Sequence, residues 1–91
     1  MHEALAYGFK CLIDEKFIAA DSLCNEEFLL TGPDSQVDSV ALVFFVSAIE
    51  DFMFDRGEQD FFVDLLKIPN FDTSNPVVTL RQFSDAIFPG A

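Results

Sequence analysis

The chain has 91 residues, of which 51% are hydrophobic, including 12 Phe but no Trp. This length predicts a single domain spanning residues 1–91, and the apolar fraction supplies a core and argues against intrinsic disorder. The formal net charge of −11, from 16 acidic and 5 basic residues, disfavours nucleic acid and anionic membranes as partners and favours proteins with basic faces.

The first helix is predicted over residues 3–16, because one apolar stripe recurs at helical spacing through Leu5, Phe9, Leu12 and Ile13. Gly8 weakens this helix by roughly 1 kcal/mol relative to Ala. Residues 19–36 are predicted to form a partly hydrophobic loop. A short helical turn at 25–27 would direct Phe28, Leu29 and Leu30 inward, and a turn follows at 31–35, where Pro33 cannot continue a helix.

The longest helix is predicted from Ser39 to about Met53. Asp38 or Ser39 offers an N-cap, and the apolar run continues through Glu50 and Asp51, which is long for a strand. The predicted buried face comprises Leu42, Phe45, Val46, Ile49, Phe52 and Met53, and the opposite face Ala41, Ala48 and Asp51. Residues 55–57 are expected to end this helix.

A short acidic helix is predicted over 58–67, with Phe61, Phe62, Leu65 and Leu66 buried, followed by an irregular connection at 69–76 anchored by Phe71. The last helix should start at a capping box of Thr79 and Gln82, with Val78 and Phe83 as a hydrophobic staple, and stop at Pro89-Gly90. The predicted fold class is therefore all-α, a small antiparallel bundle of three main helices plus one or more short ones.

The stretch VDSVALVFFVSAIEDFM, residues 37–53, resembles the second helix of acyl carrier proteins. Asp38-Ser39-Val40 matches the Asp-Ser-hydrophobic start of that helix, and Glu50-Asp51 matches its closing acidic pair. By this resemblance Ser39, preceded by Asp38, would carry 4'-phosphopantetheine. A phosphopantetheinyl transferase would install the group from coenzyme A, and the thiol of the arm would hold acyl groups as thioesters.

Two other serines compete for this assignment. Asp21-Ser22-Leu23 is a closer local match to the family's Asp-Ser-Leu motif, but Gly32-Pro33 would break a helix that started there. Asp34-Ser35 follows Gly32-Pro33, much as in a Gly-x-Asp-Ser start. With Ser35 as the modified serine, however, the downstream helix would be shifted by four residues relative to the family's second helix. We therefore rank Ser39 first, Ser35 second and Ser22 last. A further alternative is that Ser39 is an ordinary N-cap.

The chain departs from the family pattern in two places. Phe44 stands where carrier proteins usually place an acid that partner enzymes read, and the segment from Phe54 to Val78 is longer than the family's usual connection. Phe44 would either be a core residue that packs under this segment or an exposed residue that contacts a partner protein. The resemblance assigns partner docking to Val40, Phe44, Glu50 and Asp51, and candidate residues for an acyl pocket are Phe45, Val46, Phe62 and Ile68.

These features predict a non-catalytic, monomeric acyl carrier of the cytoplasm, serving a dedicated lipid, lipopolysaccharide or secondary-metabolite pathway through enzymes with basic docking patches. The only histidine, His2, lies at the terminus, which argues against a Ser-His nucleophilic site. Cys11 and Cys24 are too few for a zinc site, no metal site is expected, and no apolar run is long enough to insert in a membrane. The alternatives are an acidic helical interaction module without a prosthetic group and a peptidyl or aminoacyl carrier.

Overall fold

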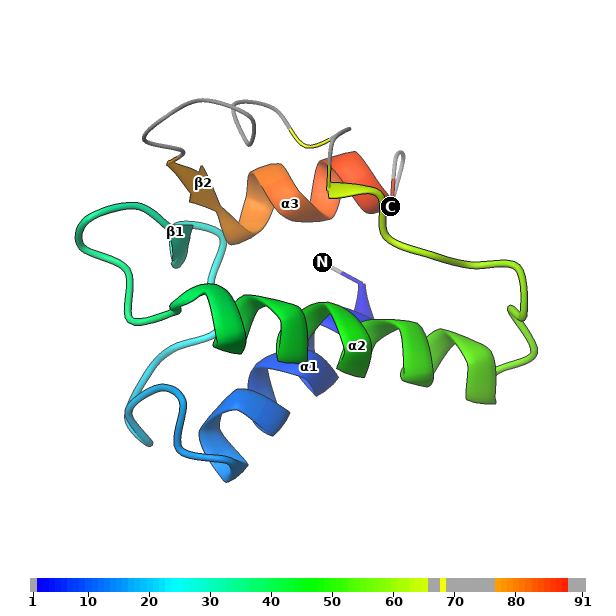
Figure 1. The fold of residues 1–91 in the computed structure, drawn as a ribbon, viewed down its shortest axis with the longest axis horizontal. Coiled ribbons are helices and arrows are strands. Elements are labelled where there is room, and N and C mark those ends of the chain that lie inside the picture. Colours follow the sequence, from blue (N-terminus) through cyan, green and yellow to red (C-terminus); the bar gives the residue numbers. More distant parts are fainter. Residues whose placement is uncertain (1, 66–67, 69–76, 89–91) are drawn as a thin grey trace.

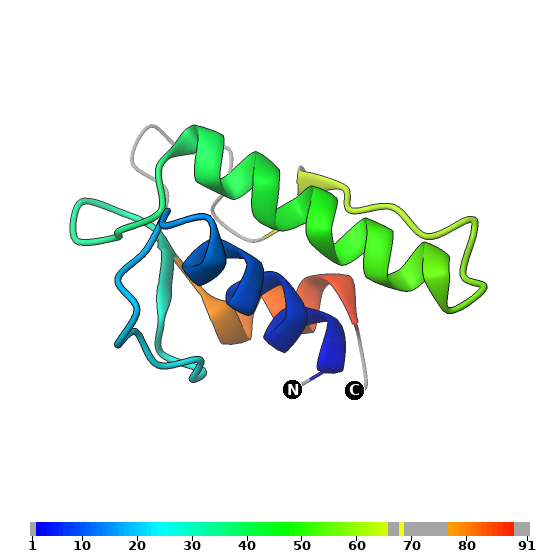
Figure 2. The ribbon, with the colours of Figure 1, turned by 90° about the horizontal axis from the view of Figure 1, so that it is seen from below.

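The computed structural model describes residues 2–65, 68 and 77–88. Its elements, in chain order, are α1 (Glu3–Asp14), β1 (Leu29–Thr31), α2 (Ser39–Asp55), β2 (Val78–Thr79) and α3 (Leu80–Ile87). In the view of Figure 1 the ribbon of α2 crosses between those of α1 and α3, and Figure 2 shows that both of these helices lie on the same side of α2. The predicted order of three main helices is therefore confirmed.

The predicted antiparallel arrangement holds between α1 and α2 but not between α2 and α3. In both views the chain runs in opposite directions along α1 and α2, but in the same direction along α2 and α3 (Figures 1 and 2). β2, which leads directly into α3, lies on the side of the molecule where α2 starts (Figures 1 and 2). Within the described ranges, no helix is both long enough and apolar enough to cross a bilayer.

A two-stranded antiparallel sheet, which the all-α prediction lacked, joins β1 to β2. Leu29 lies opposite Thr79, and Thr31 lies opposite Val78, with an irregularity between the two pairs. The pairing continues into the first turn of α3, where the Leu80 amide donates to the Phe28 carbonyl at 2.7 Å. Aromatic and β-branched residues on both segments suit this extended pairing. Of the residues predicted to point inward, Leu30 is buried and Phe28 packs against the core, whereas Leu29 is only half-buried. Leu29 and Leu30 lie in a strand and not in the predicted helical turn.

α1 ends in a Schellman motif that turns the chain back towards α2. The amide of Phe17 donates to the Leu12 carbonyl at 2.9 Å, and that of Lys16 donates to the Ile13 carbonyl at 3.0 Å. Lys16 adopts a positive φ of 64° at the position that helices usually give to Gly. The motif places Phe17 against Phe44 of α2, with ring centroids 5.1 Å apart.

The apolar surface of α2 is wider than the single stripe predicted from sequence. Ala41 and Ala48, expected on the outer face, are buried together with Phe45. The cause is that α2 is covered from two directions: Phe45 lies close to Gly8 of α1 and its ring contacts that of Phe83 in α3. The core fills this space between the helices and the sheet. As predicted, α2 ends before Gly57, whose φ is 92°.

The helix predicted over 58–67 is wrong for the described part of that segment, because residues 58–64 form no α-helix. Long-range contacts hold this part instead: the Val63 amide donates to the Glu50 carboxylate at 3.0 Å, and Phe61 stacks on Phe88. Val63 is buried, whereas Phe62, predicted to be buried, is 68% exposed. Leu66, Phe71, Pro89 and Gly90 lie outside the described residues.

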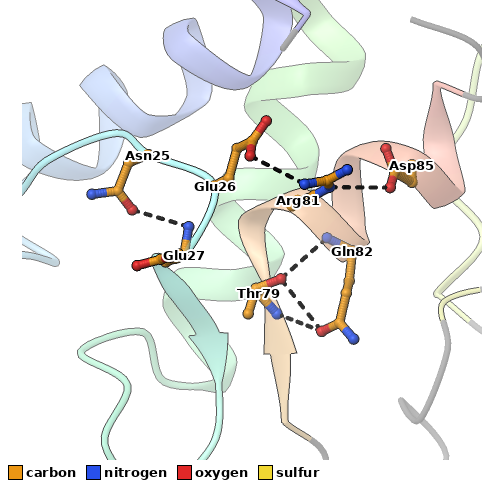
Figure 3. A network of polar contacts seen from close by, with 7 residues as sticks. All are labelled: Asn25, Glu26, Glu27, Thr79, Arg81, Gln82 and Asp85. Atoms are coloured by element: carbon orange, nitrogen blue, oxygen red, sulfur yellow. Dashed lines mark hydrogen bonds and ion pairs between the residues drawn. The ribbon is translucent and has the colours of Figure 1, made fainter.

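The start of α3 follows the sequence prediction closely. The backbone amide of Gln82 donates to Thr79 Oγ1 at 3.2 Å, and the backbone amide of Thr79 donates to Gln82 Oε1 at 2.9 Å. These two hydrogen bonds complete the capping box (Figure 3). Val78 and Phe83, the predicted staple, are both buried. Arg81 joins this end of α3 to the segment before β1 through Glu26, at 3.4 Å.

Candidate functional site

Asp38, not Ser39, caps α2. Its Oδ1 accepts a hydrogen bond from the Ala41 amide at 2.7 Å, and Ser39 is the first helical residue. Both residues are exposed. The Ser39 hydroxyl has no hydrogen bond to any residue in the described part of the chain. The plain N-cap alternative for Ser39 is therefore wrong, and the Ser39 hydroxyl is available for chemistry.

The two competing serines hold the loop together. Ser35 Oγ donates to the Leu29 carbonyl at 2.8 Å and accepts from the Val37 amide at 3.0 Å, so it fixes the path between β1 and α2. Ser22 Oγ accepts from the Gln36 side chain at 3.1 Å. Neither is at the start of a helix. Modifying Ser35 would break a contact that orders the loop, whereas modifying Ser39 would break none within the described residues.

A pocket of about 340 Å³ opens beside Ser39, between β1, the following loop and the first turns of α2. We call it the β1–α2 pocket; it is lined by Leu30, Thr31, Gly32, Val37, Asp38, Ser39 and Leu42. Its apolar walls come from three aliphatic side chains. Thr31 Oγ1 is buried and has no hydrogen-bond partner within the described part of the chain.

The residues predicted to line an acyl pocket do not gather at this pocket. Phe45 and Ile68 are buried in the core, Val46 is half-buried and Phe62 is exposed. None of them is among the residues that line the β1–α2 pocket. Sequence reasoning missed five of the lining residues: Thr31 and Gly32 within the predicted turn at 31–35, Leu30 and Val37 on either side of it, and Leu42 in α2. The only signal for them is the hydrophobic residue on each side of that turn.

The residues predicted for partner docking have different environments. Val40 is 67% exposed, and Asp51 is also exposed. Phe44 is half-buried against Phe17, which supplies the cover that the segment after α2 was expected to give. Glu50 is half-buried and uses its carboxylate to hold the Val63 amide. Val40 and Asp51 are thus the two most accessible members of the set.

Within the part of the chain that the structure describes, the remaining reactive side chains form no second candidate site. His2 accepts a hydrogen bond from the Ala4 amide at 3.0 Å, and its ring stacks on Phe88. A side-chain hydrogen bond to Cys11, together with the electrostatic interaction between the two groups, raises the pKa of the Tyr7 phenol. Among the residues that the structure describes, no three His, Cys, Asp or Glu side chains gather as a metal site would require.

Comparison with models of known protein families gives no match, and neither the curated proteins nor the solved structures contain one. Any functional assignment therefore depends on the chemistry of Asp38, Ser39 and the β1–α2 pocket.

Proposed function

We propose that the chain is an acyl carrier protein in which Ser39 holds 4'-phosphopantetheine and the thiol of the arm carries acyl groups as thioesters. The protein would not itself be an enzyme. Its partners would be a phosphopantetheinyl transferase and acyl-transfer enzymes with basic docking patches, in a dedicated lipid, lipopolysaccharide or secondary-metabolite pathway. We further propose that it acts as a cytoplasmic monomer.

The observation that carries this proposal is the exposed Ser39 hydroxyl at the head of a 17-residue helix that Asp38 already caps. A phosphodiester suits this position, because the first amides of a helix lack intrahelical partners and the helix dipole is positive there. The amides of Ser39 and Val40 donate no hydrogen bond to the described part of the chain. Ser39 needs no activating base within this protein, since the transferase would supply it.

Incubation with coenzyme A and a broad-specificity phosphopantetheinyl transferase, followed by intact mass measurement, tests the proposal. We expect a mass gain of one phosphopantetheine group in the unaltered protein and none in Ser39→Ala. Ser35→Ala and Ser22→Ala are matched controls that should still gain the group. No gain with several transferases would contradict the carrier assignment, and a gain that persists in Ser39→Ala would move the site.

The second candidate is an acidic interaction module without a prosthetic group. It is favoured by the surface of α2, where Val40 and Val43 are 67% and 62% exposed and Asp51, farther along the helix, is exposed as well. A chain that is not modified by any transferase, yet binds a basic partner through this face, would support the second candidate over the first.

A further inference from the structure

The β1–α2 pocket has the dimensions and composition of a site for a small organic group. Its volume of about 340 Å³ lies at the lower end of the range of roughly 300–1,000 Å³ that ligand pockets occupy. Leu30, Val37 and Leu42 give it apolar walls, and Ser39 stands at its edge. A branched aliphatic group would bury its surface there.

Thr31 adds a polar requirement. Its Oγ1 is buried without a partner, and a buried polar atom left unpaired costs about 1–3 kcal/mol. The residue belongs to the pocket wall, and a rotation of about 120° about its Cα–Cβ bond can move the hydroxyl to the position that the methyl group now occupies. A hydroxyl or amide of a ligand in the pocket would give this hydroxyl the partner that the described residues do not provide.

The charge around the pocket disfavours an anionic ligand. None of the described residues that line it is basic, Asp38 contributes a carboxylate, and the whole chain carries a formal charge of −11. An acidic group inside the pocket would lose its hydration without gaining a cation from these lining residues. An uncharged aliphatic group with a hydroxyl or amide beside it therefore suits the pocket.

We propose that the pocket binds the dimethyl-bearing end of the phosphopantetheine arm and that Thr31 forms a hydrogen bond with it. This inference rests on the proposed function. Beyond its phosphodiester the arm carries a carbon with two methyl groups, then a secondary hydroxyl and an amide, which is the combination that the pocket requires. Since Ser39 lines the pocket, this part of the arm reaches it directly, whereas an acyl group at the far end would have to fold back.

A weak intrinsic affinity is sufficient for this contact. Covalent attachment through a short flexible link gives an effective concentration in the millimolar range. A group that binds with a Kd of a few millimolar would therefore occupy the pocket for a substantial fraction of the time. The arm would then be held along the protein by its first half, and the thiol end would remain accessible to partner enzymes.

Titration of the unmodified, ¹⁵N-labelled protein with free pantetheine, followed by NMR, tests the pocket separately from Ser39 modification. We expect millimolar pantetheine to shift the amide signals of Leu30, Thr31, Gly32 and Leu42. Thr31→Val, which keeps the shape of the side chain, should weaken binding about fivefold or more, and Thr31→Ser should restore it. Ser47→Ala, on an exposed part of α2, is the matched control and should change nothing.

A parallel titration with the butyryl thioester of N-acetylcysteamine represents an acyl cargo. Equal or stronger shifts of the pocket signals with this probe would overturn the inference in favour of an acyl site. Absence of pocket shifts with pantetheine, or equal binding by Thr31→Val, would also overturn it. Failure of the proposed function looks different: the transferase assay then gives no mass gain, whatever the titration shows.

Discussion

Gly8 of α1 lies directly against the ring of Phe45 in α2, so that a β-carbon at position 8 would come within 2.8 Å of Phe45 Cε1 and 3.2 Å of Ile49 Cγ1. We predict that Gly8→Ala lowers the free energy of unfolding by about 1 kcal/mol. The gain in helix propensity of about 1 kcal/mol is outweighed by overpacking, which costs about 1–3 kcal/mol. Urea denaturation measures the change.

A double-mutant cycle checks the cause. In a Phe45→Leu background the ring is absent, so Gly8→Ala should cost less than it does in the unaltered protein. Strict additivity of the two substitutions would show that the destabilisation does not come from this contact.

Replacing Ser35 should lower the free energy of unfolding more than replacing Ser39. Ser35→Ala removes a hydroxyl that joins the Leu29 carbonyl to the Val37 amide, and we expect a loss of about 1–2 kcal/mol. Ser39→Ala removes an exposed hydroxyl at a helix start capped by Asp38, and the change should stay within about 0.5 kcal/mol. Thermal unfolding of both variants tests this, and a Ser39→Ala loss as large as that of Ser35→Ala would contradict it.

Glu50 should order the segment that follows α2. Its carboxylate is half-buried and accepts from the Val63 amide, and hydrogen bonds to charged groups contribute about 1.5–3 kcal/mol. We predict that Glu50→Ala speeds hydrogen exchange at the Val63 amide at least tenfold, while Glu50→Gln, which keeps an acceptor, has a smaller effect. Asp51→Asn, at the exposed neighbouring position, is the control. Unchanged exchange at Val63 in Glu50→Ala would refute the assignment.

The polar contacts at the start of α3 should differ in strength (Figure 3). Thr79→Ala removes the side-chain half of the capping box and should cost about 1 kcal/mol in urea denaturation. Arg81→Ala removes two ion pairs, but the Arg81 side chain is 65% exposed, so the cost should stay below about 0.5 kcal/mol. The reverse order of the two costs would show that the ion pairs, and not the cap, stabilise this helix end.

The helices were predictable because their signals are local. An apolar repeat predicts α1, Asp38 lies immediately before the helix that it caps, and Thr79 lies three residues before Gln82. These patterns depend on neighbours within one or two turns. For the same reason, the start of α2 at Ser39 could be derived from sequence, although the choice of Asp38 over Ser39 as the cap could not.

The sheet and the segment after α2 could not be derived in this way. Leu29 pairs with Thr79, which lies far along the chain, so neither short strand is specified by its own residues. The apolar spacing after Gly57 suits a helix, but the contact from Val63 to Glu50 stabilises an extended path instead. The β1–α2 pocket depends on the position of β1 relative to α2, so it too could not be predicted from the sequence.

The turn at the end of α1 limits how far α2 can be treated as a portable module. Phe44 is covered by Phe17, which is directed towards it by the left-handed conformation of Lys16. Grafting residues 38–55 onto another scaffold would transfer Asp38 and Ser39 intact, but it would leave an aromatic ring uncovered one turn from the serine. A functional transplant would have to include α1 with its Schellman motif.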